Sequence, residues 1–411
     1  MNVAVIGGGP AGVMAAITAA QAGAKVYLFD KNGRIGKKLR ITGKGRCNIT
    51  NACESSELIN NVPRGGRFLY SAFSRFSNFD LIDFMESIGV ATKVERGNRV
   101  FPQSDSAITV IDALNKQLKE SGVVFIGTEV KGVITDENGV KGISLADGRN
   151  VRADAVVLAT GGLSYPQTGS TGDGYKMAKQ AGHKVTPLEP SLVPLVCAEE
   201  WAGKLTGLSL KNVALKITDM SGKKVYEDFG EMLFTHFGIS GPIVLSASSH
   251  MSAKGQYKAF IDLKPALTEE QLDKRLIRDF EKYAKKDFIN SLDDLLPKRL
   301  IETVAQLSDI EFHKKTGELT KKQRQGFATL LKALPLTVTG FRPINEAIIT
   351  SGGVSTNEIN PKTMESKLVK NLYFAGEIID ADAYTGGFNL QIAFSTGYLA
   401  GKGVVENGVW Q

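Results

Sequence analysis

The stretch MNVAVIGGGPAGVMAAITAAQAGAKVYLFD, residues 1–30, decides the fold. Its apolar residues 3–6 predict a short buried strand, and the alanine-rich run that ends near residue 22 predicts a helix. A second strand is expected at residues 25–29, directly before Asp30. A strand, a helix and a second strand in this order indicate a parallel sheet in an α/β domain.

Gly7, Gly9 and Gly12 form a G-x-G-x-x-G motif between the first strand and the helix. Gly7 allows a tight turn, Gly9 lets a diphosphate approach the backbone, and Gly12 lets the helix pack closely on the strand. The helix N-terminus offers N–H groups to phosphate oxygens. Asp30 stands where an acid can accept hydrogen bonds from a ribose. This context predicts a bound dinucleotide rather than a glycine turn kept for packing alone.

The composition is that of a globular protein with two or three domains, because 42% of its 411 residues are hydrophobic and 23% are charged. Three cysteines give no disulfide framework and no zinc spacing, so we expect no metal. Residues 1–24 are uncharged, but they lack a basic start and are interrupted by three glycines and a proline. We therefore expect a cytoplasmic protein that has no membrane partner.

The net charge of +7 is concentrated near the start of the chain. Residues 1–67 hold ten Lys or Arg side chains and three Asp or Glu side chains, and the rest of the chain is balanced. This excess suggests an anionic ligand near the segment. A solvated basic loop remains the alternative.

Two later segments favour FAD as the dinucleotide. VRADAVVLATGG at residues 151–162 predicts a buried strand that runs into a glycine turn. Residues 371–401 predict a strand, then Glu377 and Asp380, then a helix opened by two glycines. These segments resemble the FAD-binding halves of glutathione-reductase-like and fumarate-reductase-like flavoproteins, in which the late acid holds the ribityl chain and the helix N-terminus faces the flavin pyrimidine. An NAD dehydrogenase needs no strand, acid and glycine-led helix of this kind near the end of its chain.

Five further segments recur together in one family: IGKKLRITGKGRCNITN, VFPQSDSA, MLFTHFGISGP, TSGGVSTNEINPKTMESK and AGEIIDADAYTGGFNLQIA. On them the whole chain resembles the BaiN/RdsA family of bacterial FAD-dependent NAD(P)/FAD oxidoreductase-like flavoproteins, which includes an aminoacetone oxidase. The resemblance implies that residues 40–51 wrap FAD and line the pocket beside its ring.

The chemistry of residues 40–51 agrees with this role. Two glycines permit close backbone approach, Lys44 or Arg46 can meet diphosphate oxygens, and Asn48 and Thr50 offer neutral hydrogen bonds. Cys47 is expected to be a small thiol lining the pocket. A redox disulfide with Cys53 is the less favoured alternative, because no C-x-x-C is present.

The predicted cofactor site comprises residues from the glycine motif, the polar loop and the later strand ends. They are Gly7, Gly9, Pro10, Ala11, Gly12, Asp30, Lys31, Lys38, Arg40, Thr42, Gly43, Gly45, Arg46, Cys47, Asn48, Val130, Ala159, Thr160, Gly161, Gly376, Glu377, Asp380, Gly387, Phe388, Asn389 and Leu390.

The predicted fold is an α/β, Rossmann-like FAD-binding domain interrupted by a β-rich insert that carries a helical sub-domain. We expect the FAD-binding domain at residues 1–191 and 353–411, and the substrate or cap domain at residues 192–352. Within this insert, residues 192–265 and 334–352 should be β-rich and residues 266–333 helical. The family resemblance implies the same arrangement.

Two residues of the insert are candidates for catalysis. His236 lies in LFTHFGISGP, where a histidine can act as an acid, a base or a substrate-orienting group. Arg342 could clamp a carboxylate or phosphate. A structural histidine and an interdomain ion pair are the plain alternatives. His183, His250 and His313 stand in contexts typical of the surface.

The leading hypothesis is an FAD-dependent oxidoreductase that transfers hydride between a small organic substrate and flavin N5. It is either an oxidase of the amine or aminoketone type or a reductase fed by NAD(P)H as a transient electron donor. No second G-x-G-x-x-G follows residue 12, so no dedicated NAD(P)H domain is expected. The alternative is a flavin-binding protein that acts on or with RNA. Residues 268–325 hold 13 basic and 12 acidic side chains, which argues against nucleic acid as a partner.

Overall fold

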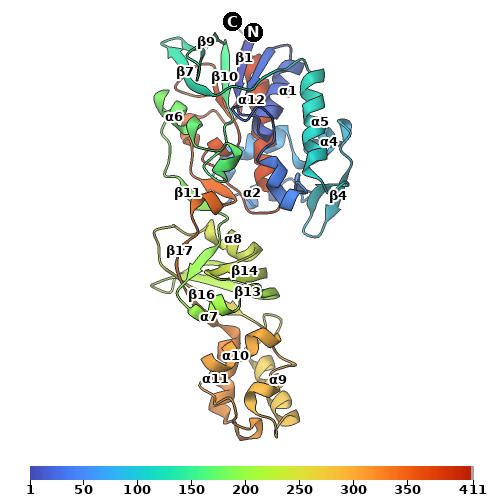
Figure 1. The fold of residues 1–411 in the computed structure, drawn as a ribbon, viewed down its shortest axis with the longest axis vertical. Helices are drawn as coiled ribbons and strands as arrows, with labels where there is room; N and C mark the ends of the chain where they lie inside the picture. Colours follow the sequence, from blue (N-terminus) through green and yellow to red (C-terminus); the bar gives the residue numbers. More distant parts are fainter. Residues whose placement is uncertain (409–411) are drawn as a thin grey trace. The chain divides into compact units, whose positions relative to one another are not determined.

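The computed structural model describes residues 1–408 (Figure 1). The chain divides into two compact units, one formed by residues 1–191 with the segment from residue 343 onward, and the other by residues 192–342. Within residues 1–408, no helix is both long enough and apolar enough to cross a membrane.

A five-stranded parallel sheet in the order β19-β10-β1-β2-β6 forms the centre of the first unit. Its strands are β1 (Asn2–Ile6), β2 (Lys25–Phe29), β6 (Val124–Ile126), β10 (Ala155–Leu158) and β19 (Leu372–Phe374). Every residue of β10 is buried, as expected for a strand covered on both faces. The chain runs from β1 to β2 on one side and later adds β10 on the other. The order of the strands therefore reverses between β1 and β10, where open α/β sheets bind their ligands.

Helices α1 (Pro10–Gln21) and α12 (Phe388–Gly408) lie side by side in the first unit, blue and red in Figure 1. Their backbones approach closely because the facing residues are small. A Cβ atom added at Gly397 would lie 2.3 Å from the carbonyl oxygen of Ala11, and one at Gly401 would lie 2.6 Å from that of Ala15. The C-terminal helix is thereby fixed against the helix that opens the fold.

Smaller elements complete the first unit. One antiparallel sheet joins β3 (Thr50–Asn51), β5 (Arg99–Pro102) and β4 (Thr92–Glu95), and another joins β7 (Val130–Asp136), β8 (Gly139–Leu145) and β9 (Asn150–Arg152). The helices are α2 (Glu57–Asn60), α3 (Tyr70–Arg75), α4 (Asn78–Ser87), α5 (Ala107–Glu120) and α6 (Asp173–Gln180). Strand β11 (Glu189–Ser191) pairs antiparallel with β18 (Ile349–Ser351).

The second unit is a closed barrel in the order β12-β15-β14-β13-β16-β17. Its strands are β12 (Leu195–Cys197), β13 (Ser209–Asp219), β14 (Lys224–Thr235), β15 (Gly238–Ser240), β16 (Tyr257–Asp262) and β17 (Leu334–Phe341), with helices α7 (Glu200–Lys204) and α8 (Pro242–Ser248). Between β16 and β17 lie the amphipathic helices α9 (Glu269–Lys282), α10 (Lys298–Leu307) and α11 (Lys321–Lys332). Phe280 of α9, Phe327 of α11 and Phe288 pack together.

The division of the chain differs from the expected one at its second boundary. Residues 343–352 were expected in the insert, but they belong to the first unit. The physical reason is the pairing of β18 with β11, which ends at Ser191. Of the segment 334–352 that was expected to be β-rich and part of the insert, only β17 belongs to the second unit.

Candidate cofactor site and candidate catalytic residues

The predicted cofactor residues follow four neighbouring strands of the parallel sheet. Gly7 comes after β1, Asp30 after β2, Ala159 after β10 and Gly376 after β19. Because the strands are parallel, these residues share the carboxyl edge of the sheet, on both sides of the point where the strand order reverses.

The three glycines of the motif have different surroundings. A Cβ atom at Gly7, whose φ is +111°, would lie 2.3 Å from the carbonyl oxygen of Ala159, and one at Gly12 would lie 1.9 Å from that of Gly7. These two positions are closed by the protein's own backbone. At Gly9 a Cβ atom would meet nothing within 4 Å. Gly9 directly precedes α1, so the open space lies at the helix N-terminus, which suits a diphosphate.

Asp30 organises the loop that follows the glycine motif. Its Oδ2 accepts a hydrogen bond from the N–H of Gly8 at 2.8 Å, and its Oδ1 accepts one from the N–H of Asn32 at 2.7 Å. A carboxylate has about four acceptor positions. Acceptance from a ribose is therefore compatible with these bonds and stays a prediction.

The polar loop at residues 42–51 contacts the start of α12, although the two lie far apart in the sequence. A Cβ atom at Gly387 would lie 2.3 Å from the carbonyl oxygen of Thr50. The Asn51 side chain donates to the carbonyl oxygen of Gly386 at 3.1 Å, and Thr50 Oγ1 donates to Gln391 Oε1 at 2.6 Å. The polar loop and the start of α12, which were both expected beside the flavin ring, are therefore in contact.

The contacts of Arg46 do not support its expected role at the diphosphate. Its guanidinium donates to Glu95 and, through Nε, to Asp105 Oδ1 at 2.7 Å. It also lies over the ring of Phe101, 4.1 Å from the centroid. Arg46 lowers the pKa of Glu95, and Lys93 and Arg46 together lower the pKa of Asp105. Its charge is thus neutralised within the protein, and the side chain anchors the loop.

Lys38 and Glu377 form an ion pair with each other. Lys38 Nζ lies 2.7 Å from Glu377 Oε2 and donates to Ser164 Oγ at 2.6 Å. Glu377 Oε1 accepts from Ser164 Oγ and from the N–H of Thr350, both at 2.9 Å. These bonds make Glu377 a structural acid, which leaves Asp380 as the better candidate for the ribityl chain. In the same way, Lys31 is bound to Asp173 and its charge is compensated.

Three predicted cofactor residues carry buried polar atoms that make no hydrogen bond within residues 1–408. They are Asn48 Oδ1, Thr160 Oγ1 and Asp380 Oδ1. A buried polar atom without a partner costs about 1–3 kcal/mol. A ligand with hydroxyl and N–H groups would satisfy such atoms, so these residues fit FAD.

Burial suppresses the acidity of the thiol at Cys47. It raises the pKa of Cys47 to about 12, although a hydrogen bond with Thr42 opposes the shift. The thiolate that redox chemistry needs is therefore disfavoured. Cys47, Cys53 and Cys197 are all free thiols in this structure.

The remaining predicted residues have mixed surroundings. Val130 is buried at the start of β7, Gly161 has a φ of +73°, and Arg40 is exposed. The Asn389 side chain holds a loop, because its Nδ2 donates to the carbonyl oxygen of Ala383 at 2.7 Å and its Oδ1 accepts from the same residue's N–H at 2.9 Å. Asn389 can therefore serve a cofactor only through its backbone N–H in the first turn of α12.

The two candidate catalytic residues come together in the second unit. His236 and Phe237 form the two-residue turn between β14 and β15, and their rings lie 4.9 Å apart. The Arg342 guanidinium lies over the Phe237 ring, 4.6 Å from its centroid. The adjacent Thr235 Oγ1 is buried and makes no hydrogen bond among the described residues. His236 is exposed, so it is accessible to solvent.

Sequence reasoning was wrong about His183, which is only 3% exposed. Its Nδ1 lies 3.2 Å from Glu358 Oε2, and its Nε2 lies 2.8 Å from Ser366 Oγ. Burial lowers the pKa of His183. Its partners lie more than 170 residues away along the sequence, so no local pattern could have predicted these contacts.

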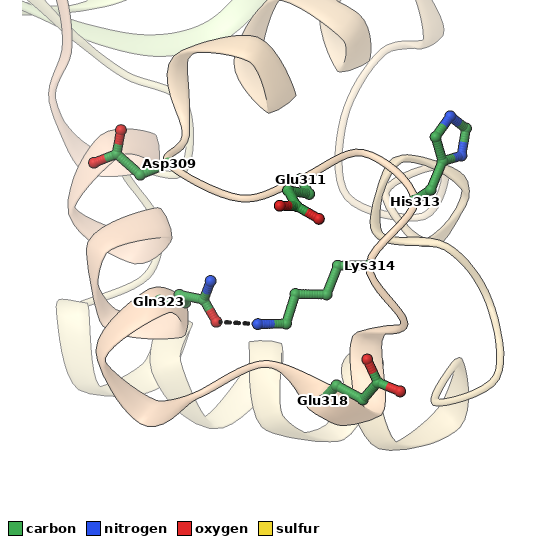
Figure 2. Close-up of a pocket in the computed structure, with 6 residues that line it drawn as sticks. All are labelled: Asp309, Glu311, His313, Lys314, Glu318 and Gln323. Atoms are coloured by element: carbon green, nitrogen blue, oxygen red, sulfur yellow. Dashed lines mark hydrogen bonds between the residues drawn. The ribbon is translucent and has the colours of Figure 1, made fainter.

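A polar recess of about 460 Å³ lies in the helical part of the second unit (Figure 2). It is lined by Asp309, Glu311, His313, Lys314, Glu318 and Gln323, and Lys314 Nζ donates to Gln323 Oε1 at 3.1 Å. No predicted site residue lines it. No group of three or more His, Cys, Asp or Glu side chains within residues 1–408 is arranged to hold a metal ion.

Comparison with known proteins identifies relatives along almost the whole chain. Residues 1–403 match the model of the HI0933-like protein Rossmann domain. The chain is 34% identical to the 3-dehydro-bile acid delta(4,6)-reductase of Clostridium scindens, and the match covers 98% of this chain and 99% of that one. It is 33% identical to the ribosomal RNA dihydrouridine synthase of Escherichia coli, and the match covers 98% and 97%.

A solved structure supports the fold. The 3-ketosteroid delta1-dehydrogenase of Sterolibacterium denitrificans superimposes with a TM-score of 0.53 at 13% identity, over 98% of this chain and 99% of that one.

Proposed function

Because the chain belongs to the HI0933-like family of FAD-dependent oxidoreductases, we propose that it is a reductase of a carbon–carbon double bond conjugated to a carbonyl group. Two relatives support this reaction class by their names, a delta(4,6)-reductase of a 3-dehydro-bile acid and a dihydrouridine synthase. Dihydrouridine is the product of saturating a uracil double bond that is conjugated to a carbonyl. A reductase therefore fits both relatives, whereas an amine oxidase fits neither name.

The observation that carries the reaction class is the pair of named relatives, and the observation that supports FAD as the cofactor is the set of buried atoms without hydrogen bonds at Asn48, Thr160 and Asp380. When bound there, FAD supplies the hydride transfer. Gly9 and the N-terminus of α1 would hold its diphosphate, Thr160 and Asp380 would bind its hydroxyl groups, and Asn48 would accept a hydrogen bond.

His236 and Arg342 would act on the substrate. Arg342 has a delocalised cation that can bind a carboxylate or polarise a carbonyl group. His236 can donate the proton that completes the reduction, because a histidine exchanges protons near neutral pH. Both side chains contact the Phe237 ring.

The first experiment separates a reductase from an oxidase. The FAD-loaded protein is mixed without oxygen with NADH and then with NADPH, and the visible flavin band is followed. Rapid bleaching supports the reductase fed by a nicotinamide. Absence of bleaching, together with peroxide formation from amines or aminoketones in air, would refute the proposal in favour of an oxidase.

A second experiment tests whether the double bond belongs to a small molecule or to RNA. The name of the Escherichia coli relative favours RNA, whereas the balanced charge of residues 268–325 favours a small molecule. We expect a conjugated 3-oxo steroid dienone to reoxidise the bleached protein, and we expect a ribosomal RNA fragment to give no mobility shift at low salt. A shift that disappears at high salt, with no steroid turnover, would assign RNA as the substrate.

A further inference from the structure

The most deeply buried carboxyl group near the candidate cofactor site is that of Asp382, which is 1% exposed. Its Oδ2 accepts a hydrogen bond from Ser191 Oγ and its Oδ1 accepts one from Ser351 Oγ, both at 3.1 Å. Arg64 Nε lies 3.6 Å from Oδ1. Nothing in the proposed reaction uses this group, yet the protein surrounds it with donors.

The two serines belong to β11 and β18, which form a two-stranded ribbon. Ser191 is the last residue of the first unit before the chain enters residues 192–342, and β18 follows the return of the chain. Asp382 thus joins both strands of the ribbon through its side chain.

The backbone around Asp382 leads directly to the candidate cofactor site. Asp382 N–H donates to the carbonyl oxygen of Arg64 at 3.2 Å, and Ala383 is held by Asn389 in the first turn of α12. Two residues before Asp382 stands Asp380, whose Oδ1 makes no hydrogen bond among the described residues and lies 4.0 Å from Arg64 Nη1. The position of Asp382 therefore affects the position of Asp380 before it and of the first turn of α12 after it.

We propose that Asp382, with Arg64, is a positioning residue for the cofactor site, and that its ionised form holds residues 380–389 in place for FAD. This rests on the proposed location of FAD at this edge. An ionised carboxylate accepts from both serines and attracts Arg64, whereas a protonated one loses an acceptor position and this attraction.

The surroundings of Asp382 bring its titration into an accessible range. Burial raises its pKa to about 6, while Arg64, Ser191 and Ser351 oppose the shift and Asp380 adds to it. The folded state therefore binds more protons than the unfolded state between about pH 4 and pH 6. The stability contributed by this group rises as the pH falls through this window, while the proposed hold on FAD weakens.

The test measures FAD affinity by flavin fluorescence between pH 5 and pH 8, together with the free energy of unfolding. For the wild-type chain, if only the ionised form binds FAD, we expect affinity to fall about 10-fold from pH 7 to pH 5. Asp382→Asn should abolish this dependence, with an affinity at pH 7.5 close to that of the wild type at low pH. Asp219→Asn, which changes a half-buried acid of the second unit, is the control and should keep the wild-type profile.

A second variant covers the case in which Asp382→Asn does not fold. Ser351→Ala removes one donor to the anion and should move the midpoint upward by about one pH unit. A wild-type profile that is flat, or that survives in both variants, overturns the inference and leaves the FAD site intact. Failure of the wild-type chain to bind FAD at every pH refutes the proposed site itself.

Discussion

Replacing Gly9 by alanine tests whether the space at this glycine is needed for binding the cofactor or for packing of the fold. The backbone at Gly9 has a φ of −80°, which alanine adopts without strain, and the added methyl group meets no protein atom within 4 Å. Alanine is a poorer helix cap than glycine by about 0.5–1 kcal/mol. It also restricts the unfolded chain, which stabilises the fold by about 0.4–1 kcal/mol. The free energy of unfolding without FAD should therefore change very little.

The effect on FAD should be large. A methyl group at Gly9 occupies the space before the N-terminus of α1, so the diphosphate cannot reach the N–H groups there. A hydrogen bond to a charged group contributes about 1.5–3 kcal/mol. Loss of two such bonds removes about 3–6 kcal/mol, which weakens FAD affinity by about 10²–10⁴-fold.

The assay is a fluorescence titration of FAD into the chain, with urea unfolding of the same samples. Gly326→Ala is the matched control, because Gly326 lies in α11 and its added methyl group also meets nothing within 4 Å. That variant should keep FAD affinity. Gly12→Ala, whose Cβ atom would lie 1.9 Å from the Gly7 carbonyl oxygen, should impair folding itself. Binding of FAD by Gly9→Ala within about threefold of the wild type would falsify the placement of the diphosphate, because that is below 1 kcal/mol.

Four further predictions follow from the contacts described. Arg46→Ala should lower the free energy of unfolding, less so at high salt, and leave FAD affinity within a few-fold; a loss of FAD binding without a loss of stability would restore the diphosphate role. Cys47 should resist iodoacetamide at pH 8 until the chain unfolds, because burial raises its pKa; rapid labelling of the native chain contradicts this. His236→Asn should lower turnover by about 10²–10⁴-fold with FAD bound, while the exposed control His313→Asn leaves it unchanged; equal turnover in both removes His236 from the mechanism. His183 has a lowered pKa in the folded state, so its stabilising contribution is complete above its unfolded pKa of about 6.5 and is lost as the pH falls below that value. Urea unfolding of His183→Gln at several pH values should therefore show a smaller loss of stability in acid than the wild type. An equal loss in both proteins refutes the assignment.

The sequence predicted the features that depend on local pattern. The glycine motif between strand and helix was sufficient for the parallel sheet, and the resemblance of the late strand, acid and glycine-led helix to those of known flavoproteins implied FAD. The family, the fold and the FAD-dependent oxidoreductase activity are confirmed by the match over residues 1–403 and by the relatives of that length. The parallel sheet follows from hydrophobic period and glycine geometry, which neighbouring residues determine. The family and the FAD-dependent activity were implied by the resemblance to known flavoproteins.

Side-chain partners across long separations were out of reach. Arg46 was one of two candidates for the diphosphate, with Lys44, because its charge suits phosphate, but Glu95 and Asp105 lie beside it in the folded chain. Glu377 was one of two acids near the expected ribityl site, with Asp380, and Lys38 neutralises it across more than 300 residues. A charge in a sequence shows what it can bind, and only the fold shows which partner reaches it.

The central sheet has a consequence for how the protein is made. Strand β10 ends at Leu158, and its neighbour β19 begins only at Leu372, after the whole second unit. At about 5–20 residues per second, a ribosome needs about 10–40 s to cover this distance. During that time one edge of the sheet offers unpaired N–H and C=O groups to any extended chain nearby. Helix α12 is made still later. The nascent protein thus passes through a period of exposure to misassociation, and it cannot complete its candidate cofactor site until synthesis is nearly finished.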